Sequence, residues 1–268
     1  DGSVNTTVTI SINQGSTDVN YDGVGSQAIT VTTTDNDTAG FTLSKTLAAV
    51  TDSGSDTDTF TVILDSQPDS SVVISVTSAD TDKCVVSLGS LTFLTGNWNA
   101  AQTITITGEQ DDTIDANRNV NITMAVVDGS SDDNFDGVDN QIVTVTVSDH
   151  LTAGFTLSTS SVTVAETATT ATFTALLTAK PDSNVVLSIA SADTGEATVS
   201  PNALTFLTSN WNTTQTVTIT GVDDSLIDGS VDTAVTISIN QGSSDDNFDG
   251  VNSQAITVTT TDNDTAGF

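Results

Sequence analysis

The chain has 268 residues, 36% of them hydrophobic, and its 35 acidic residues against four lysines and arginines give a formal net charge of −31. Nucleic acid and anionic membranes would repel so negative a chain, and no apolar run is long enough to cross a bilayer, so we expect no nucleic-acid partner and no direct membrane insertion. Cys84 is the single cysteine, which excludes an intrachain disulfide framework and any cysteine-rich zinc site.

An eight-residue joint recurs along the chain. Thr-Asp-Asn-Asp-Thr-Ala-Gly-Phe stands at 34–41 and at 261–268, and an altered copy stands at 148–155. Residues 1–41 also align without a gap to residues 228–268 and differ from them at only six positions. Because residue 1 matches the middle of a later unit, we expect the chain to be a window of a longer protein. The internal period predicts the C-terminal part of a repeat unit at 1–40, a complete unit at 41–154 and another complete unit at 155–268.

Apolar and polar residues alternate in short runs throughout these units. Val8 and Ile10 alternate with threonines near the start, Ile122 and Met124 alternate with polar residues in the middle, and Val217 lies in a similar run near the end. A period of two is typical of strands that bury one face, and turn residues separate the runs. About seven such strands in one unit predict a two-sheet β-sandwich, so the expected fold class is all-β.

Other repeated positions are expected to serve packing. Trp98 and Trp211 each lie in an Asn-Trp-Asn sequence just before a predicted strand, and we interpret them as packing residues rather than as platforms for a ligand. Cys84 has Ala197 as its counterpart in the next unit. We therefore expect Cys84 to be a small buried residue.

A short acidic motif also recurs in all three pieces. Asp18, Asp132 and Asp245 each begin the sequence Asp-x-Asn-x-Asp-Gly, which is the first half of an EF-hand-type loop. Such a loop needs a bidentate glutamate at its twelfth position, where the last copy has Ile256. An ordinary loop between strands is therefore favoured over a calcium loop at these positions.

Carboxylates stand at the ends of predicted strands in unit 155–268. Glu166 follows an alternating run, Asp223 and Asp224 share one loop, and Asp262 and Asp264 close the unit. Calcium needs six to eight oxygen ligands, which several loops can supply together. These acids therefore indicate a Ca²⁺ site. The alternative is that they only form turns, which aspartate favours through local hydrogen bonds.

The order of these acids resembles that of the Calx-β domain, a family known from sodium–calcium exchangers and from many large extracellular repeat proteins. The shared features are a glutamate after the first strand, an aspartate in a later turn, a Gly-x-Asp-Asp-x-x-x-acid loop and a terminal Asp-x-Asp-x-Ala-Gly-Phe. The resemblance covers both complete units and implies tandem immunoglobulin-like sandwiches, each with a Ca²⁺ cluster at one tip beside the following domain. The ligands it implies for unit 155–268 are Glu166, Asp193, Asp223, Asp224, Asp228, Asp262 and Asp264, with the backbone carbonyl of Leu226.

The other two pieces depart from this set. In unit 41–154, Gln110 replaces the first loop aspartate and Asp149-His150-Leu151 replaces Asp-Asn-Asp, which should weaken or abolish binding. The acids that remain there are Asp52 in place of the glutamate, Asp80, Asp111, Asp115 and Asp149. The opening piece keeps Asp1, Asp35 and Asp37 but lacks their partner loops.

The same residues bear on the class of function. His150 is the single histidine, no nucleophile stands beside a base, and the glutamates at 109, 166 and 196 look scattered along the chain, so we expect no enzyme. We predict a structural repeat region of a large secreted or cell-surface protein, an adhesin stalk or extracellular fibre stiffened by Ca²⁺. Its partners would be neighbouring repeats and other copies in a fibre. The alternatives are an adhesion module that binds a surface glycan or a protein, and a calcium sensor.

Overall fold

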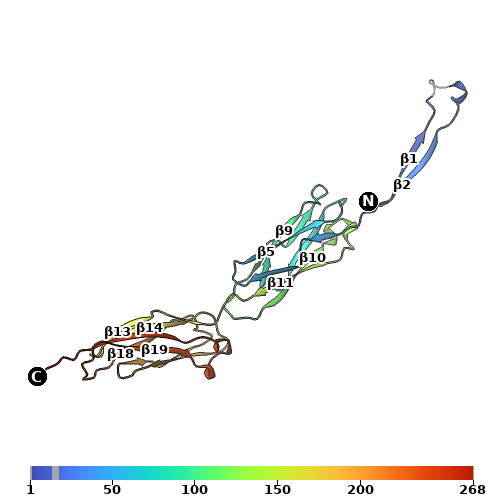
Figure 1. Ribbon diagram of the computed structural model, residues 1–268. Helices are drawn as coiled ribbons and strands as arrows, with labels where there is room; N and C mark the ends of the chain where they lie inside the picture. Colours follow the sequence, from blue (N-terminus) through green and yellow to red (C-terminus); the bar gives the residue numbers. More distant parts are fainter. Residues whose placement is uncertain (1, 14–17, 268) are drawn as a thin grey trace. The chain divides into compact units, whose positions relative to one another are not determined.

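The computed structural model describes residues 2–13 and 18–267, and these residues form strands and short turns (Figure 1). The helices among them are single 3₁₀ turns, and none has the length and hydrophobicity of a membrane span. The predicted all-β class is therefore confirmed for the described residues. The turns are η1 (Val19–Tyr21), η2 (Asp128–Ser130), η3 (Asp133–Phe135), η4 (Gln241–Ser243) and η5 (Asp246–Phe248).

The opening piece forms a two-stranded antiparallel hairpin of β1 (Val4–Ile10) and β2 (Gln27–Thr33). Its alternating apolar residues are largely exposed, whereas their counterparts in the last unit are fully buried. The exposed residues are Val8, Ile10, Ile29 and Val31, and the buried counterparts are Val235, Ile237, Ile256 and Val258. The pattern of strands was thus predicted correctly, but burial of one face needs the rest of a sandwich.

The next nine strands form two sheets. The four-stranded sheet has the order β3 (Phe41–Leu43), β5 (Thr57–Leu64), β9 (Gln102–Gly108) and β7 (Cys84–Val86). The five-stranded sheet has the order β4 (Leu47–Thr51), β11 (Gln141–Ser148), β10 (Arg118–Val126), β6 (Val72–Ser78) and β8 (Ser90–Phe93). Their inward residues, such as Phe60 and Ile122, are buried, and so is Cys84, as predicted.

The last nine strands repeat this arrangement. One sheet has the order β12 (Phe155–Leu157), β14 (Thr170–Leu177), β18 (Gln215–Gly221) and β16 (Ala197–Ser200). The other has the order β13 (Ser161–Ala165), β20 (Gln254–Thr261), β19 (Val231–Ile239), β15 (Val185–Ser191) and β17 (Ala203–Phe206). Phe173, Phe206 and Phe248 fill the core, and Trp211 packs against it. Both nine-stranded assemblies are therefore immunoglobulin-like sandwiches, as expected.

Each sandwich has nine strands rather than about seven, and at two places short strands that follow each other in sequence belong to different sheets. The first apolar run of the last sandwich begins as β12, which pairs with β14, and continues as β13, which pairs with β20. β16 and β17 are likewise neighbours in sequence and belong to different sheets. Each half buries one side, but the alternation changes phase at the crossing, since the inward residues are Phe155 and Leu157 before it and Val162 and Val164 after it.

The described residues group into two compact units whose boundaries cut across the first sandwich. The second unit contains the whole last sandwich together with Thr51–Asp56 and Glu109–Arg118. It also contains the end of β11 and the joint that follows, since its main segment begins at Val147. Two loops from the end of the first sandwich therefore belong to the same compact unit as the last sandwich.

Candidate metal centre

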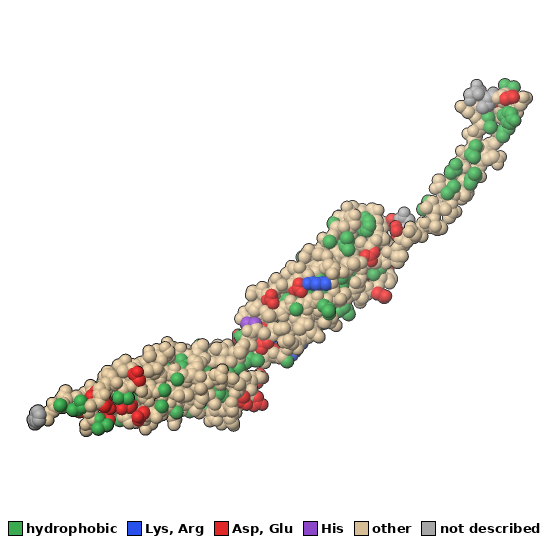
Figure 2. Space-filling model, viewed as in Figure 1, with side chains coloured by type: hydrophobic (Ala, Val, Ile, Leu, Met, Phe, Trp, Pro, Cys, Tyr) green, Lys and Arg blue, Asp and Glu red, His purple; other side chains and the backbone are tan. Residues whose placement is uncertain are grey.

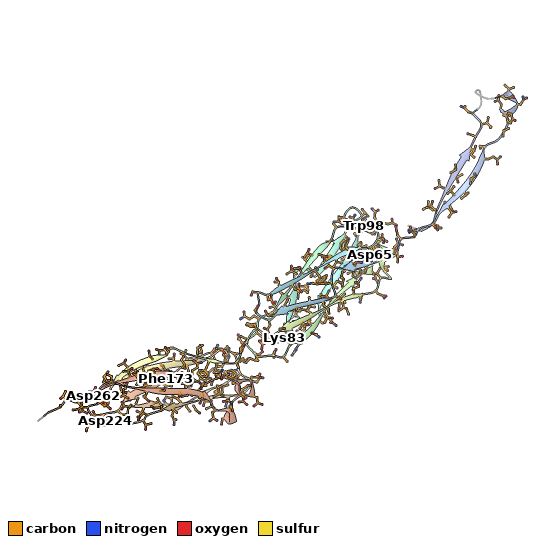
Figure 3. The ribbon with its side chains drawn as sticks, in the orientation of Figure 1. Asp65, Lys83, Trp98, Phe173, Asp224 and Asp262 are labelled. Carbon is orange, nitrogen blue, oxygen red and sulfur yellow. The ribbon has the colours of Figure 1, made fainter. Side chains whose placement is uncertain are left out.

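The acids predicted for the last repeat lie at one tip of its sandwich. β13 and β20 are parallel neighbours, so Glu166 after β13 and Asp262 after β20 emerge at the same edge. The loop between β18 and β19 brings Asp223, Asp224 and Asp228 to that edge. Figure 3 labels Asp224 and Asp262 at this end, and Figure 2 shows acidic side chains gathered there.

Two overlapping groups of carboxylates form the centre. Oxygens of Glu166, Asp224 and Asp264 lie within 4.8 Å of one another, and so do oxygens of Glu196, Asp224 and Asp228. The two glutamates are buried, with 1% and 9% of their surface exposed, while the shared Asp224 is half-buried. Three or more carboxylates at this separation provide the oxygen-rich environment that a hard divalent cation needs.

Glu196 is a candidate metal ligand that the sequence prediction missed. The glutamates were expected to be scattered rather than paired across a cleft, and the structure adds that Glu166 and Glu196 lie in the same charged cluster. The available signal was its position in the turn after β15, three residues beyond the predicted ligand Asp193. Lys83 occupies the equivalent position in the other unit, so comparison of the repeats concealed it.

Backbone amides hold several of the carboxylates in place. The amide of Leu226 donates to Asp224 Oδ1 at 2.7 Å, and the amides of Gly229 and Asp264 donate to the two oxygens of Asp262 at 2.9 and 2.6 Å. The amide of Asn263 donates to Glu166 Oε2 at 3.1 Å. Its side-chain nitrogen donates to Asp223 Oδ1, also at 3.1 Å. The predicted ligand Asp193 uses one oxygen in its own turn, where it accepts from the amide of Gly195 at 2.8 Å.

One oxygen in the cluster is left without a hydrogen-bond partner. Asp264 Oδ2 is buried and accepts no hydrogen bond among the described residues. A buried carboxylate oxygen without a partner is costly, because it has lost its water and gained nothing in return. A cation bound between Asp264, Glu166 and Asp224 would supply the missing partner.

The cluster also shifts the proton affinities of its members. Burial, followed by repulsion from Asp228, raises the pKa of Glu196, and burial with repulsion from Asp262 raises the pKa of Asp264. The amide of Asn263 opposes this trend at Glu166, but burial and neighbouring charges outweigh it and raise that pKa as well. The amides of Gly229 and Asp264 lower the pKa of Asp262. The cluster thus carries more negative charge than its hydrogen bonds from backbone amides compensate.

Without calcium, the last sandwich is expected to become more stable as the pH falls from 7 towards about 4.5. A carboxyl whose folded pKa is raised binds its proton more tightly in the folded state, so it adds stability below its unfolded pKa and loses it as the pH rises. The unfolded values are 4.5 for Glu166 and Glu196 and 3.8 for Asp264. Thermal unfolding in chelator at pH 7 and 5 measures the gain. It should shrink in Glu196→Gln, and a loss of stability over this range would contradict the expectation.

The tip of repeat 41–154 has a different arrangement. Asp52, Asp149 and His150 have ligand atoms within 4.8 Å of one another, and Asp52 is buried. Asp52 Oδ1 lies 2.8 Å from the backbone nitrogen of His150 and 2.6 Å from its Nδ1. Asp149 accepts from the amides of Asp115 and Leu151 at 2.8 and 2.6 Å. Hydrogen-bond donors of the chain itself thus occupy these acids.

The remaining predicted ligands lie in turns or outside the described residues. Asp111 Oδ1 accepts from the amide and the hydroxyl of Thr113, both at 2.9 Å. Asp80, in the first compact unit, accepts from the amide of Asp82 at 3.1 Å. Asp35 accepts from the amide of Asp37 at 2.9 Å, and Asp1 lies outside the described residues. The turn-forming role weighed above fits the geometry of Asp111, Asp80 and Asp35.

The EF-hand-like motif forms a strand-connecting loop, as the sequence favoured. Asp132 is buried, and its Oδ2 accepts from the amides of Asp69 and Ser70 at 2.6 and 2.8 Å. Its Oδ1 accepts from the amide of Asn134 at 2.9 Å. Asp245 repeats the pattern in the last sandwich, where it accepts from the amide of Ser183 at 2.7 Å. In each aspartate Oδ2 therefore fastens one loop to another, while Oδ1 closes the turn of its own loop.

Comparison with known proteins places the chain in no named family. No protein-family model and no curated protein matches it. Among solved structures, it is similar to the calcium-binding domain CBD12 of CALX1.1, at 14% identity and a TM-score of 0.38, covering 75% of this chain and 79% of that one.

A surface layer protein and a domain of Intimin are also among the similar structures. The surface layer protein SbsC, domains 1–6, has 15% identity and a TM-score of 0.34, covering 72% of this chain and 20% of that one. The D00-D0 domain of Intimin has 14% identity and a TM-score of 0.28, covering 81% and 98%. At these values the likenesses say nothing about the function of this chain.

Proposed function

We propose that the chain is a structural repeat region of a large secreted or cell-surface protein, such as a stalk or fibre, in which Ca²⁺ stiffens the joint at the tip of repeat 155–268. The observation that carries the proposal is the cluster of buried carboxylates around Asp224, in which Asp264 Oδ2 has no hydrogen-bond partner. The unit boundaries after residues 40 and 154, and membership of the Calx-β family, are part of the same proposal.

The site suits calcium by its chemistry. Its ligand atoms are carboxylate oxygens, which hard cations prefer, and it includes no histidine or cysteine. Two groups of three carboxylates share Asp224, an arrangement that could hold two ions with Asp224 as the bridge. When bound, calcium would neutralise the mutual repulsion of the acids. The joint residues Asp262 and Asp264 would then be fixed to the β18–β19 loop, which leaves the chain beyond them less freedom.

Repeat 41–154 is proposed to bind calcium weakly or not at all. Its tip has Gln110, Leu151 and Lys83 where the last repeat has acids, so it carries less negative charge. The His150 side chain already contacts the Asp52 carboxylate. This hydrogen-bonding side chain occupies the Asp52 oxygen that a cation would otherwise contact.

The adhesion-module alternative gains little support. Binding of a sugar or a peptide to a flat β-surface would use exposed aromatic side chains. Phe135 and Phe248 are buried to 1% and 0% exposure, and among the three equivalent aromatic residues only Tyr21, at 56%, is exposed. We therefore propose the structural role and assign no ligand site to these positions.

Calcium titration of the full chain by calorimetry tests the proposal. Saturable binding is expected, together with a rise in the melting temperature, because a ligand that binds only the folded state stabilises it. Asp224→Ala combined with Asp264→Ala should remove the binding. Asp182→Ala combined with Asp246→Ala removes the same charge from exposed positions of the same repeat and should leave it intact. The absence of binding at millimolar calcium, or equal binding by both variants, would overturn the site.

A further inference from the structure

A loop of repeat 41–154 is docked on the last sandwich within the second compact unit. The amide of Lys180 donates to the carbonyl of Asp112 at 2.8 Å, and Thr113 forms a parallel β-bridge with Lys180. Ile114 packs against the hydrophobic core of the last sandwich. A backbone hydrogen bond, a parallel β-bridge and one apolar side chain thus hold the loop Glu109–Arg118 against the last sandwich.

The loop 222–230 of the last repeat is equivalent to this docked loop, but its large apolar side chains are exposed. Leu226 and Ile227 occupy the positions of Thr113 and Ile114, and they are 62% and 61% exposed. Two large adjacent aliphatic side chains at a loop tip are costly to leave in water. The change from threonine to leucine makes this loop more apolar than the one that is already docked.

The turn that receives the docked loop, Lys180–Pro181, has an equivalent in the first sandwich. Lys180 lies directly before the buried Pro181, and Gln67 lies directly before the buried Pro68 in the first sandwich. Lys180, which is contacted by a loop, is half-buried, whereas Gln67 is exposed. The turn at Gln67 and its neighbours Ser66 and Asp69 line a cavity of the first compact unit. The contact uses a backbone amide, so a change from lysine to glutamine leaves the turn able to receive a loop.

We propose that the loop 222–230 is a docking surface for a further repeat of this same kind, received by the turn equivalent to Lys180–Pro181. Continuity with the contact made by Thr113 and Ile114 identifies the occupant. The inference rests on the proposed function only in assuming that repeats follow one another. Asp224 and Asp228 flank Leu226 and Ile227, so a cation held by these acids would also fix the shape of the docking loop.

The test extends the full chain after Phe268 by a copy of residues 156–268, so that Phe268 takes the place of Phe155. The added repeat is isotopically labelled alone, by segmental ligation, and amide exchange is followed by NMR in calcium and in chelator. The added lysine equivalent to Lys180 is expected to exchange at least about tenfold more slowly than in a chain carrying Leu226→Asp and Ile227→Asp. As a positive control, Ile114→Asp in the unextended chain, labelled throughout, should speed the exchange of the amide of Lys180 itself.

A matched control carries the same added charge elsewhere. Leu94→Asp combined with Leu207→Asp alters exposed leucines outside the docking loop and should leave the protection unchanged. Equal, fast exchange of the added lysine in the parent and in the loop variant, in both calcium and chelator, would overturn the docking surface. Calorimetric titration of the unextended chain with calcium tests the metal centre independently of the docking surface. Protection without calcium binding would keep the docking and reject the metal centre, while binding without protection would do the reverse.

Discussion

Phe173→Ala is expected to lower the free energy of unfolding of the last sandwich by about 3–5 kcal/mol, because truncating a buried phenylalanine leaves a cavity that the surroundings fill only in part. Phe173 is 1% exposed and lies on β14, between β12 and β18 in the sheet (Figure 3). Denaturant unfolding of the full chain carrying Trp98→Phe, in which fluorescence reports Trp211 alone, measures the loss.

Leu226→Ala is the matched control for this truncation. Leu226 is 62% exposed, so its removal should change the stability of the sandwich by less than about 0.5 kcal/mol. A loss below about 1 kcal/mol for Phe173→Ala would mean that the core can collapse around the cavity. The packing described for this sheet would then be wrong.

Asp132→Ala is expected to cost the first sandwich about 3 kcal/mol, because it removes a charged acceptor from several backbone amides at once. The carboxylate accepts from Asp69, Ser70 and Asn134, at 2.6, 2.8 and 2.9 Å. Alanine would leave these donors without their partner in a loop that is otherwise folded around them. Thermal or denaturant unfolding of the full chain carrying Trp211→Phe, in which fluorescence reports Trp98 alone, measures the change.

The pH dependence gives this prediction a second readout. Burial opposes ionisation of Asp132, but the amides of Asn134, Ser70 and Asp69 outweigh it and lower its pKa below the ordinary value of 3.8. A carboxyl with a lowered folded pKa stabilises the fold above 3.8 and loses that contribution as the pH falls through its folded pKa. The cost of Asp132→Ala should therefore shrink in acid. Asp133→Ala, at the exposed neighbouring position, should cost little at either pH.

Much of the fold could be predicted from the sequence, because strands that bury one face require alternation. The pattern around Ile122 and Met124 identifies β10, and the run with Val217 identifies β18. The crossing from β12 to β13 leaves only a change of phase in the alternation, from Phe155 and Leu157 to Val162 and Val164, and a change of phase does not tell which sheet each strand joins. Which sheet a strand joins is decided by partners far away in the sequence, as when Val162 pairs with Val258.

The candidate site was predictable where its members share a loop and obscure where they do not. Asp223 and Asp224 are neighbours in sequence, so their proximity needs no knowledge of the fold. Glu196 reaches the cluster because the turn after β15 lies at the same tip as the β18–β19 loop, a relation that only the sandwich creates. The contact of His150 with Asp52 joins residues 98 positions apart and leaves no local signal either.

The parallel pairing of β13 with β20 has a mechanical consequence. These strands lie near the two ends of the last repeat, and they pair over five residues, from Ser161 opposite Thr257 to Ala165 opposite Thr261. When the two ends of a repeat are pulled apart, strands that run in parallel slide past each other, and their hydrogen bonds must yield together. An antiparallel hairpin pulled from its open end unzips one bond at a time. A force along the chain therefore loads the β13–β20 pair in shear, and a strand pair resists a larger force in shear than in unzipping.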